Sequence, residues 1–529
     1  MTGGIFARGK RTSATAFWVG TLASTVGVGL HVPMFLDAAS MNYRLAGMPM
    51  DPMMVLGMLL IAAGTLAAGY GLLPRAPHRR ETNALAVDPG PSERGDSDER
   101  LTPAHWKLML TLVMALVIDT MKPATLGFVV PGMVQEYGLS RPAVAILPLF
   151  ALTGTMIGSF LWGYLADLFG RRAAILMAAI MFIGTAICGA MPSFTWNIVM
   201  CFFMGLSAGG MLPITYTLLA ETIPAKHRGW LLVLAGGLGL VGGYFAASGS
   251  AALLEPRFGW RIMWFLGLPT GLLLVVLNQW IPESPRFLWL QGRADEARAI
   301  LARFKAALPS DWGSAVPALP GEPSRGHTPI LLQRGFAGTT ATLNLAALAW
   351  GLVNFGLLLW LPADLRAQGF DVAGSDSLLA QSSILALPTV LLTAWLYARW
   401  STRGTLIALS ILTAIGLFGI WLLGNGIPLV GLSPVVLFAI LMTGSNGVIA
   451  VLLPYSAETY PSRVRGRGTG FVAGSSKLGG IAAQAVSMAA LVPALATAAM
   501  VLALPVMVSA FMVARFCRET RGQKLEELD

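Results

Sequence analysis

The chain of 529 residues is apolar and poor in charge: 55% of its residues are hydrophobic and only 12% are charged. Soluble domains carry about 25% charged residues, so the composition excludes an ordinary soluble enzyme and indicates a protein that crosses a membrane several times. The net charge of +10 would suit a nucleic-acid-binding protein, but the basic residues lie in alternate loops between apolar runs, as in membrane proteins. The three cysteines show no spacing typical of a disulfide framework or a metal site.

The first 104 residues predict a membrane-anchored extension followed by a linker. Apolar runs at about residues 14–36 and 53–73 are each long enough to span a bilayer, which takes about 20 residues. We therefore expect residues 1–74 to form a pair of transmembrane helices. A cleaved signal peptide is the alternative for the first run, because Arg8, Lys10 and Arg11 precede it and small residues follow it. Residues 75–104 are rich in proline and charge, and they predict a disordered cytoplasmic linker.

Twelve apolar runs follow in two groups of six. The first group fills residues 105–281 and the second fills residues 336–515, with a polar region at 282–335 between them and a charged tail at 516–529. A short repeat indicates related halves: Ala220-Glu-Thr-Ile-Pro-Ala-Lys-His-Arg-Gly229 matches Ala457-Glu-Thr-Tyr-Pro-Ser-Arg-Val-Arg-Gly466 at a constant offset of 237 residues. We expect an all-α membrane protein of two six-helix halves plus an N-terminal two-helix extension.

The distribution of basic residues predicts the orientation of the chain in the membrane. Positive charge is concentrated on the cytoplasmic side of membrane proteins. We therefore expect the polar region at 282–335 and both termini of the twelve-helix core to face the cytoplasm, most naturally that of a bacterium with this protein in its inner membrane. The basic loops on that side hold Arg171, Arg172, Lys226, Arg228, Arg286, Arg293, Arg298, Arg303, Arg399, Arg403, Arg463, Arg465, Arg467, Arg518, Arg521 and Lys524.

A glycine-marked, charged turn separates the second and third core runs. In the sequence Gly163-Tyr-Leu-Ala-Asp-Leu-Phe-Gly-Arg-Arg172, Asp167 lies one to two helical turns before Arg171 and Arg172, while Gly163 and Gly170 permit a tight turn. This turn resembles the signature loop of the major facilitator superfamily. The resemblance implies two parallel six-helix halves, as the repeat does. The second half has only a degenerate counterpart of this loop, with Ala398 in place of Asp167.

Two further motifs resemble one branch of that superfamily. Ile281-Pro-Glu-Ser-Pro-Arg-Phe-Leu288 and the tail Glu519-Thr-Arg-Gly-Gln-Lys-Leu-Glu-Glu-Leu528 are similar to marks of sugar porters and of their organic-ion and aromatic-acid relatives. Together the resemblance covers about residues 105–529 and leaves out the N-terminal helix pair. The seventh core run lacks the paired glutamines of sugar porters, which favours an organic anion over a hexose as the solute.

The charges near the predicted cytoplasmic side suggest a conformational latch. Ion pairs that join helix ends would stabilise one arrangement of the bundle, and breaking them would release it. The alternative is that these charges only set topology, because exposed ion pairs contribute about 0–1 kcal/mol. The expected members are Gly163, Asp167, Gly170, Arg171, Arg172, Glu221, Arg228, Glu458 and Arg465.

Three ionisable residues lie within apolar runs, where charge is costly and usually marks a pathway. Asp119 and Lys122 are three residues apart in the first core run, and Lys477 stands in the eleventh. Aromatic-acid symporters are similar in carrying an acid in the first helix and a basic residue in the eleventh. The resemblance implies that Asp119 and Lys122 couple protons and that Lys477 binds the solute. The alternatives are mutual neutralisation of Asp119 and Lys122, and snorkelling of Lys477 to the membrane surface.

Weaker candidates for the solute site are polar or aromatic residues of the seventh, eighth, tenth and eleventh core runs. Each of them could equally form a hydrogen bond between helices. They are Trp350, Asn354, Gln381, Asn446 and Gln484.

The sequence thus predicts a secondary active transporter, not an enzyme, that moves a small organic solute by proton-coupled alternating access. An aromatic carboxylate is the expected solute, and protons and the lipid bilayer are the other expected partners. We expect a monomer that needs no cofactor and no metal and binds no nucleic acid. A sugar, polyol or organic-cation carrier of the same fold, or a membrane sensor that does not transport, is the alternative.

Overall fold

The computed structural model describes residues 11–72, 100–305, 336–427, 433–460, 465–491 and 493–521. Every regular element in these ranges is a helix. Thirteen helical spans in these ranges, several of them made of consecutive elements, are long and apolar enough to cross a membrane. The helix of the eleventh core run, α20 (Arg465–Met488), is more polar and is not among these thirteen, yet it packs inside the bundle. Most of the predicted linker and of the inter-half region lies outside the described residues.

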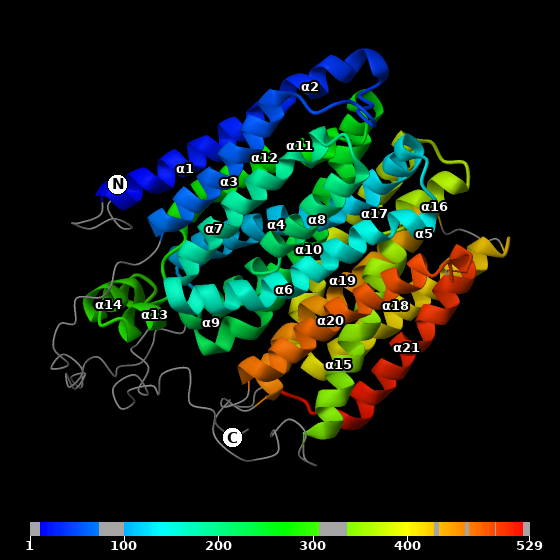
Figure 1. Cartoon of the computed structure of the whole chain (residues 1–529). Helices are drawn as coiled ribbons and strands as arrows, with labels where there is room; N and C mark the ends of the chain where they lie inside the picture. The colour runs from blue at the N-terminus through cyan, green and yellow to red at the C-terminus, as the bar shows by residue number, and fades with distance from the viewer. Residues whose placement is uncertain are drawn as a thin grey trace.

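The N-terminal extension is a pair of helices that pack against each other along their length. Glycines allow the backbones to approach closely: a Cβ placed on Gly20 would lie 2.4 Å from the carbonyl oxygen of Gly64, and one on Gly27 would lie 2.6 Å from that of Gly57. The pair lies along one edge of the molecule, beside α7 (Figure 1). Its elements are α1 (Arg11–Gly29), α2 (Val32–Asp37), the 3-10 turn η1 (Ala38–Met41) and α3 (Pro52–Leu72).

The first six-helix half extends from α4 to η4. Small residues set the close packing of α6 on α8, since a Cβ on Gly205 would lie 1.9 Å from the carbonyl oxygen of Ala151. The elements of this half are α4 (Pro103–Tyr137), α5 (Arg141–Val144), α6 (Ile146–Phe169), α7 (Arg171–Gly184), η3 (Thr185–Ala190), α8 (Phe194–Ala208), α9 (Met211–Thr222), α10 (Ala225–Phe258), α11 (Ile262–Phe265), α12 (Gly267–Leu277) and η4 (Asn278–Trp280). Two short helices, α13 (Pro285–Leu290) and α14 (Ala294–Arg303), follow it.

The second half extends from α15 to α21. Its first membrane helix is built from three segments, α15 (Ala337–Gly351), the π-helical η7 (Leu352–Leu358) and α16 (Leu361–Ala367). A π-helical segment in a membrane helix often marks a functional position. The other elements are α17 (Val372–Arg399), α18 (Thr402–Gly424), α19 (Pro434–Thr459), α20 and α21 (Leu495–Phe516).

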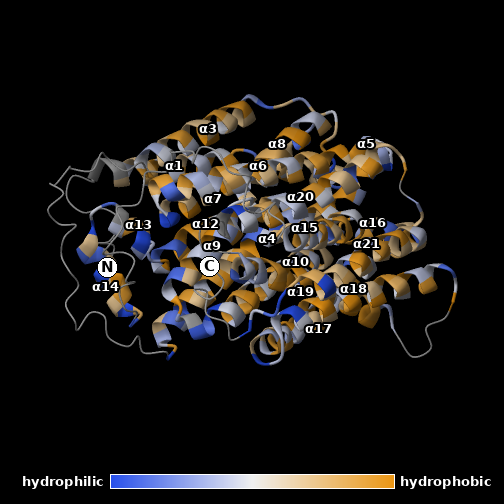
Figure 2. Ribbon diagram, turned by 90° about the horizontal axis from the view of Figure 1, so that it is seen from below, coloured by the Kyte–Doolittle hydropathy of each residue, from blue (hydrophilic) through white to orange (hydrophobic). Residues whose placement is uncertain are grey.

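The halves meet mainly where α10 packs against α17 and α19 and where α6 packs against α20 (Figure 1). We name the two ends of the bundle by their short helices. The α13 end carries α13 and α14, and the α5 end carries α5 and α16 (Figure 1). Hydrophobic residues extend along the long helices, whereas hydrophilic residues gather around α13 and α14 (Figure 2). This distribution suits a bundle whose sides face lipid and whose ends face water.

Candidate functional site

An acid and a base face each other across the two halves, deep in the bundle. Asp119 of α4 is buried, with 8% of its surface exposed, and it interacts electrostatically with Lys477 of α20. The two side chains form no ion pair within 4 Å in the described part of the chain. The Lys477 ammonium instead lies 5.2 Å from the ring centre of Phe355, on the π-helical segment. Neither charge is therefore neutralised by a direct ion pair with the other.

Lys122 lies elsewhere, so the interpretation that it neutralises Asp119 is wrong. Its ammonium donates hydrogen bonds of 2.5 Å to the carbonyl oxygen of Phe182 and to the hydroxyl of Thr185, between α4 and α7. Three residues of helix rotate by about 300°, so side chains at that spacing point about 60° apart. That divergence directs Asp119 toward the second half and Lys122 into the first. Lys122 is therefore separated from the acid that it was expected to assist.

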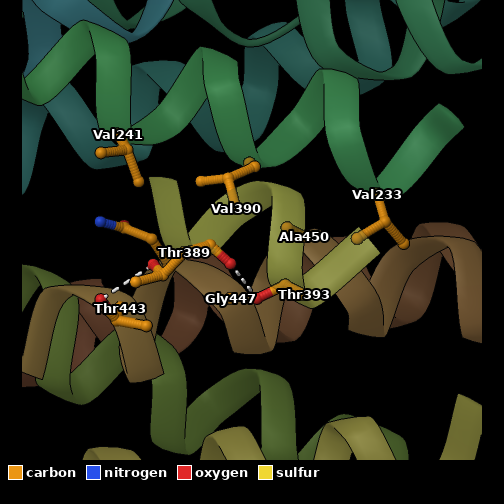
Figure 3. A pocket seen from close by; sticks show the side chains of 10 residues that line it. Val233, Val241, Thr389, Val390, Thr393, Thr443, Gly447 and Ala450 are labelled. Atoms are coloured by element: carbon orange, nitrogen blue, oxygen red, sulfur yellow. Dashed lines mark hydrogen bonds between the residues drawn. The ribbon is translucent and has the colours of Figure 1, made fainter. Parts of the chain in front are cut away.

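A small pocket lies between α10, α17 and α19, where the two halves touch (Figure 3). Its cavity volume is about 10 Å³, roughly the room that one water molecule needs. Threonines supply most of its polar lining, and Thr389 hydrogen-bonds Thr443 at 3.1 Å (Figure 3). Asn446, a predicted solute-binding residue, also lines this pocket. The pocket must widen before it can hold an organic solute.

The pocket and the charged pair are linked through one stretch of α10. Thr120, the neighbour of Asp119 in the chain, donates a hydrogen bond of 2.7 Å to the carbonyl oxygen of Gly239. Gly237 and Val241 of the same stretch line the pocket. A shift of α10 against α4 would thus act on the pocket and on the surroundings of Asp119 together.

The π-helical segment holds other predicted residues, in different roles. Asn354 is half-buried, and its side chain makes no hydrogen bond with the described residues, so it remains a candidate for solute contact. Trp350 is buried against Phe355, with ring centres 5.6 Å apart. Gln484 is fully buried, donates to the carbonyl oxygen of Phe355 at 2.5 Å and accepts from the Trp360 indole at 3.2 Å. Gln484 therefore joins α20 to the π-helical segment, which is the alternative role that the sequence left open.

Gln381 is not among the residues that line the pocket. It lies on an exposed stripe of α17 together with Ile384 and Leu385, whereas Ser382 and Ser383 are buried. The sequence pattern of α17 is apolar on several sides, so the phase of the helix could not be read from it.

The latch residues of the first half gather at the α13 end around one carboxylate that sequence reasoning missed. Arg171 pairs with Asp167 at 3.0 Å and lies 3.9 Å from Glu221. Glu283 accepts hydrogen bonds from the backbone N–H groups of Arg171 at 2.8 Å and Arg172 at 3.4 Å. Removal from water raises the pKa of Glu283, and these backbone donors partly offset that effect. Glu283 belongs to the Pro282-Glu-Ser-Pro285 motif, which could have indicated it, but this motif was taken only as a mark of resemblance.

A hydroxyl, that of Ser284, and a glycine, Gly170, join the chain around Glu283 to the neighbouring helices of this cluster. Ser284 donates a hydrogen bond to Glu221, which links the chain after η4 to the end of α9. Gly170 has a φ of +99°, and a Cβ there would lie 2.4 Å from a carboxylate oxygen of Glu283. Gly170 is therefore needed both for its backbone conformation and for space. Gly163 has open space around it and no such constraint.

The second half has a related cluster at the same end. Glu458 accepts hydrogen bonds from the hydroxyls of Tyr397 at 2.7 Å and Thr520 at 2.9 Å. Its electrostatic partner is Arg228 of α10, which belongs to the other half. Arg465, the partner expected from the sequence, begins α20, and its side chain lies outside the described part of the chain.

Ion pairs at the α5 end also join the halves, and sequence reasoning missed them. Arg141 of α5 contacts Asp364 of α16 at 2.6 Å. Arg366 of α16 contacts Glu255 of α10 at 3.0 Å and Asp376 of α17 at 3.2 Å. These residues stand near the ends of apolar runs, where they could not be told from ordinary loop charge. Both ends of the bundle are thus held together across the halves.

Comparison with known proteins agrees with this arrangement. Residues 108–484 match the family model described as Major Facilitator Superfamily. The niacin transporter NiaP of Acinetobacter baylyi is 27% identical over 387 residues, which cover 72% of this chain and 85% of that protein. The 4-hydroxybenzoate transporter PcaK of Pseudomonas putida is 26% identical over 393 residues, which cover 73% of this chain and 86% of that protein.

A solved structure shows the same fold. The proton:xylose symporter XylE, bound to 6-bromo-6-deoxy-D-glucose, superposes with a TM-score of 0.63 at 18% identity, over 80% of this chain and 98% of its own. The fold predicted from the sequence motifs is confirmed. Since the family model spans parts of both halves, the chain belongs to the Major Facilitator Superfamily of membrane transporters and is not an enzyme.

Proposed function

We propose that this chain is a proton-coupled secondary transporter of small organic carboxylates, aromatic ones above all. The observation that carries the proposal is the electrostatic interaction of Asp119 with Lys477 across the two halves. The relatives named for niacin and 4-hydroxybenzoate support it, because both of these compounds are aromatic carboxylates. Phe355 beside Lys477 and Trp350 beside Phe355 would offer apolar surface to an aromatic ring.

In the empty carrier, Asp119 and Lys477 partly compensate each other. An entering carboxylate competes for Lys477, because opposite charges attract strongly where water is scarce. Asp119 then loses its compensating charge, and burying an uncompensated carboxylate is costly. Binding a proton at Asp119 removes that cost, so solute and proton are held together. The halves then rock about the site, and both leave on the other side.

We also propose that the α13 end faces the cytoplasm of a bacterial cell and that one chain acts alone. Arg171, Arg172, Arg228, Arg286 and Arg293 all lie at that end, as positive charge does on the cytoplasmic side of membrane proteins. Both halves of the site come from one chain, so no second copy is required. A tag inserted at Gly321 should stay inaccessible to antibody from outside intact cells, and labelling there would overturn this orientation.

The direct test is uptake of labelled nicotinate or 4-hydroxybenzoate by liposomes that contain the purified protein. A proton gradient should drive accumulation in the parent. Asp119→Asn should abolish accumulation against a gradient yet keep downhill exchange, which also shows that the variant is folded. Lys477→Ala should weaken nicotinate binding about 10- to 100-fold, the loss expected for a charged hydrogen bond. Binding of nicotinamide, the neutral analogue, should change much less, and Lys477→Arg should recover part of the nicotinate affinity.

The outcomes separate the alternatives. If Asp119→Asn still concentrates the solute and Lys477→Ala binds it normally, the pair is structural and the proposal fails. Uptake of a hexose or an organic cation, with neither carboxylate taken up, would point to another solute class on the same fold. Binding without any flux of any solute would favour the sensor alternative.

A further inference from the structure

Two carboxylates share one guanidinium at the α5 end. One nitrogen of Arg366 donates to Glu255 at 3.0 Å, and the other donates to Glu255 at 3.1 Å and to both oxygens of Asp376 at 3.2 Å. Glu255 and Asp376 are 6% and 0% exposed. Because both carboxylates contact the same nitrogen atom, they also lie beside each other. This differs from Arg141 and Asp364 nearby, which pair one to one.

The charges around this group do not balance when both carboxylates are ionised. Ser375 donates to Asp376 at 3.2 Å, and Tyr244 is an electrostatic neighbour of Asp376, but neither is a cation. The other charges on the packed helices at this end are in two groups. Arg257 and Asp371 are exposed, whereas Arg141 pairs with Asp364 and Arg261 pairs with Glu136. One negative charge would therefore remain buried without compensation, and such a charge is costly. One proton on the carboxyl pair removes that cost.

The group joins the two halves, so it must break when the α5 end opens. Glu255 lies on α10 of the first half, whereas Arg366 and Asp376 lie on α16 and α17 of the second half. Separation would leave Arg366 with Asp376 alone, a balanced pair, and would return Glu255 to water, where a carboxylate is ionised at neutral pH. The closed end therefore holds one more proton than the open end.

We propose that Glu255 and Asp376 form a second proton-binding site of this transporter, which is loaded when the α5 end closes and emptied when it opens. The site is distinct from Asp119, since it lies at the end of the bundle and acts without solute. It rests on the proposed alternating access. Its consequence is that acid favours closure of the α5 end and alkali favours opening.

The test measures closure of the α5 end directly, without solute. Spin labels on Gln135→Cys, at the end of α4, and Gln368→Cys, after α16, would report the distance between the halves by pulsed EPR. Both residues are exposed, whereas the native Cys188, Cys201 and Cys517 are buried. In the parent, the short-distance population should fall as pH rises from about 5 to about 9.

Matched variants distinguish this site from simple loss of an ion pair. Glu255→Gln and Asp376→Asn each leave one carboxylate for one guanidinium, so each should remove the pH dependence and keep the end closed. Asp364→Asn removes a one-to-one pair on the same helix, so it should favour opening and keep the pH dependence. A parent with no pH dependence, or both carboxyl variants with the parent's pH dependence, would overturn the proposal. Asp119→Asn should leave the distances as responsive to pH as in the parent, so this inference and the proposed function can fail separately.

Discussion

The two charge clusters at the α13 end occupy corresponding places in the two halves but are built from different chemistry. In the first half, Glu283 accepts the backbone N–H at the start of α7 while Ser284 donates to Glu221. In the second, Glu519 accepts the backbone N–H of Thr402 at the start of α18 at 2.9 Å, while Thr520 donates to Glu458. The same arrangement of two carboxylates, a backbone N–H and a hydroxyl is thus present in both halves, and we call it the hydrogen-bonded frame.

The charges are not duplicated. Asp167 and Arg171 of the first cluster have Ala398 and Thr402 in their places in the second. Glu221 interacts with Arg171 of its own half, whereas Glu458 interacts with Arg228 of the other half. The comparison teaches that the first cluster fixes the shape of one half, while the second also holds the halves together. Only the second should resist opening of the α13 end.

The largest expected effect on stability comes from removing Glu283 or Glu519, the carboxylates of the frame that accept backbone N–H groups. Glu283→Ala leaves the N–H groups that begin α7 without their acceptor and should lower the free energy of unfolding by about 2–3 kcal/mol, as lost charged hydrogen bonds do. Glu519→Ala should cost less, about 1–2 kcal/mol, because the hydroxyls of Ser401 and Thr402 can turn to water. Reversible unfolding in mixed micelles measures both. A larger loss for Glu519→Ala would contradict the ranking.

Arg228→Gln should separate the roles of the clusters. It removes from Glu458 the cation that the first half supplies, which should cost about 1 kcal/mol of the closed state. We expect the α13 end to open more often, with little change in the stability of either half. Accessibility of a single cysteine placed at Ser475, on the half-buried face of α20, would report this opening. The matched change in the first half, Arg171→Gln, removes the cation of Glu221 within that half. It should leave that accessibility at the parent level, and equal exposure in both variants would remove the distinction.

Asp167→Asn tests whether charge matters within the first cluster. The Asp167 side chain is 72% exposed, and exposed pairs contribute about 0–1 kcal/mol. The transport rate should therefore fall no more than about five-fold, with a modest change in solute affinity. Ala398→Asp is the matched control, because it adds an acid where the second half has no arginine like Arg171, and it should not speed transport. An unchanged rate in Asp167→Asn at equal expression would show that the pair has no role in the cycle.

The smallest expected effect concerns pH: Glu283 and Glu519 should make the stability of the fold change with pH in opposite directions. Burial raises the pKa of Glu519, but hydrogen bonds from Ser401 and Thr402 outweigh this effect, so the pKa of Glu519 is lowered. Its stabilisation is therefore present above the unfolded pKa of about 4.3 and lost as pH falls through the folded pKa. Glu283 has a raised pKa, so the folded state binds more protons and stability declines as pH rises through the window above about 4.3.

Melting temperatures at a series of pH values would show this difference. Glu519→Gln should flatten the loss of stability on the acid side, whereas Glu283→Gln should flatten the decline on the rising side. If both substitutions change the profile in the same direction, the two carboxylates do not differ as described.

The sequence predicted the fold because apolar runs and the charged turn at Gly163–Arg172 are local patterns. It also identified Asp119 and Lys477, since ionisable residues are rare in apolar runs. It could not show that these two face each other, because their partnership depends on how separate helices rotate and pack. The same limit applies to Lys122, which turns away from Asp119, and to Gln381, because the directions of both side chains depend on helix phase. The π-helical segment at Leu352–Leu358 left no recognisable pattern, and its effect on Asn354 could not be foreseen.

The loop after α2 has a consequence for motion. The backbone N–H groups of Leu45 and Ala46 donate to Glu136 at 2.7 and 2.9 Å, and Glu136 in turn pairs with the fully buried Arg261 at 2.7 Å. The extension is therefore hydrogen-bonded to the ion pair that joins α4 to the start of α11. It must move with the first half as one rigid body. In the alternating access proposed above, the first half would therefore move as a body of eight membrane helices, counted over the described residues, against one of six.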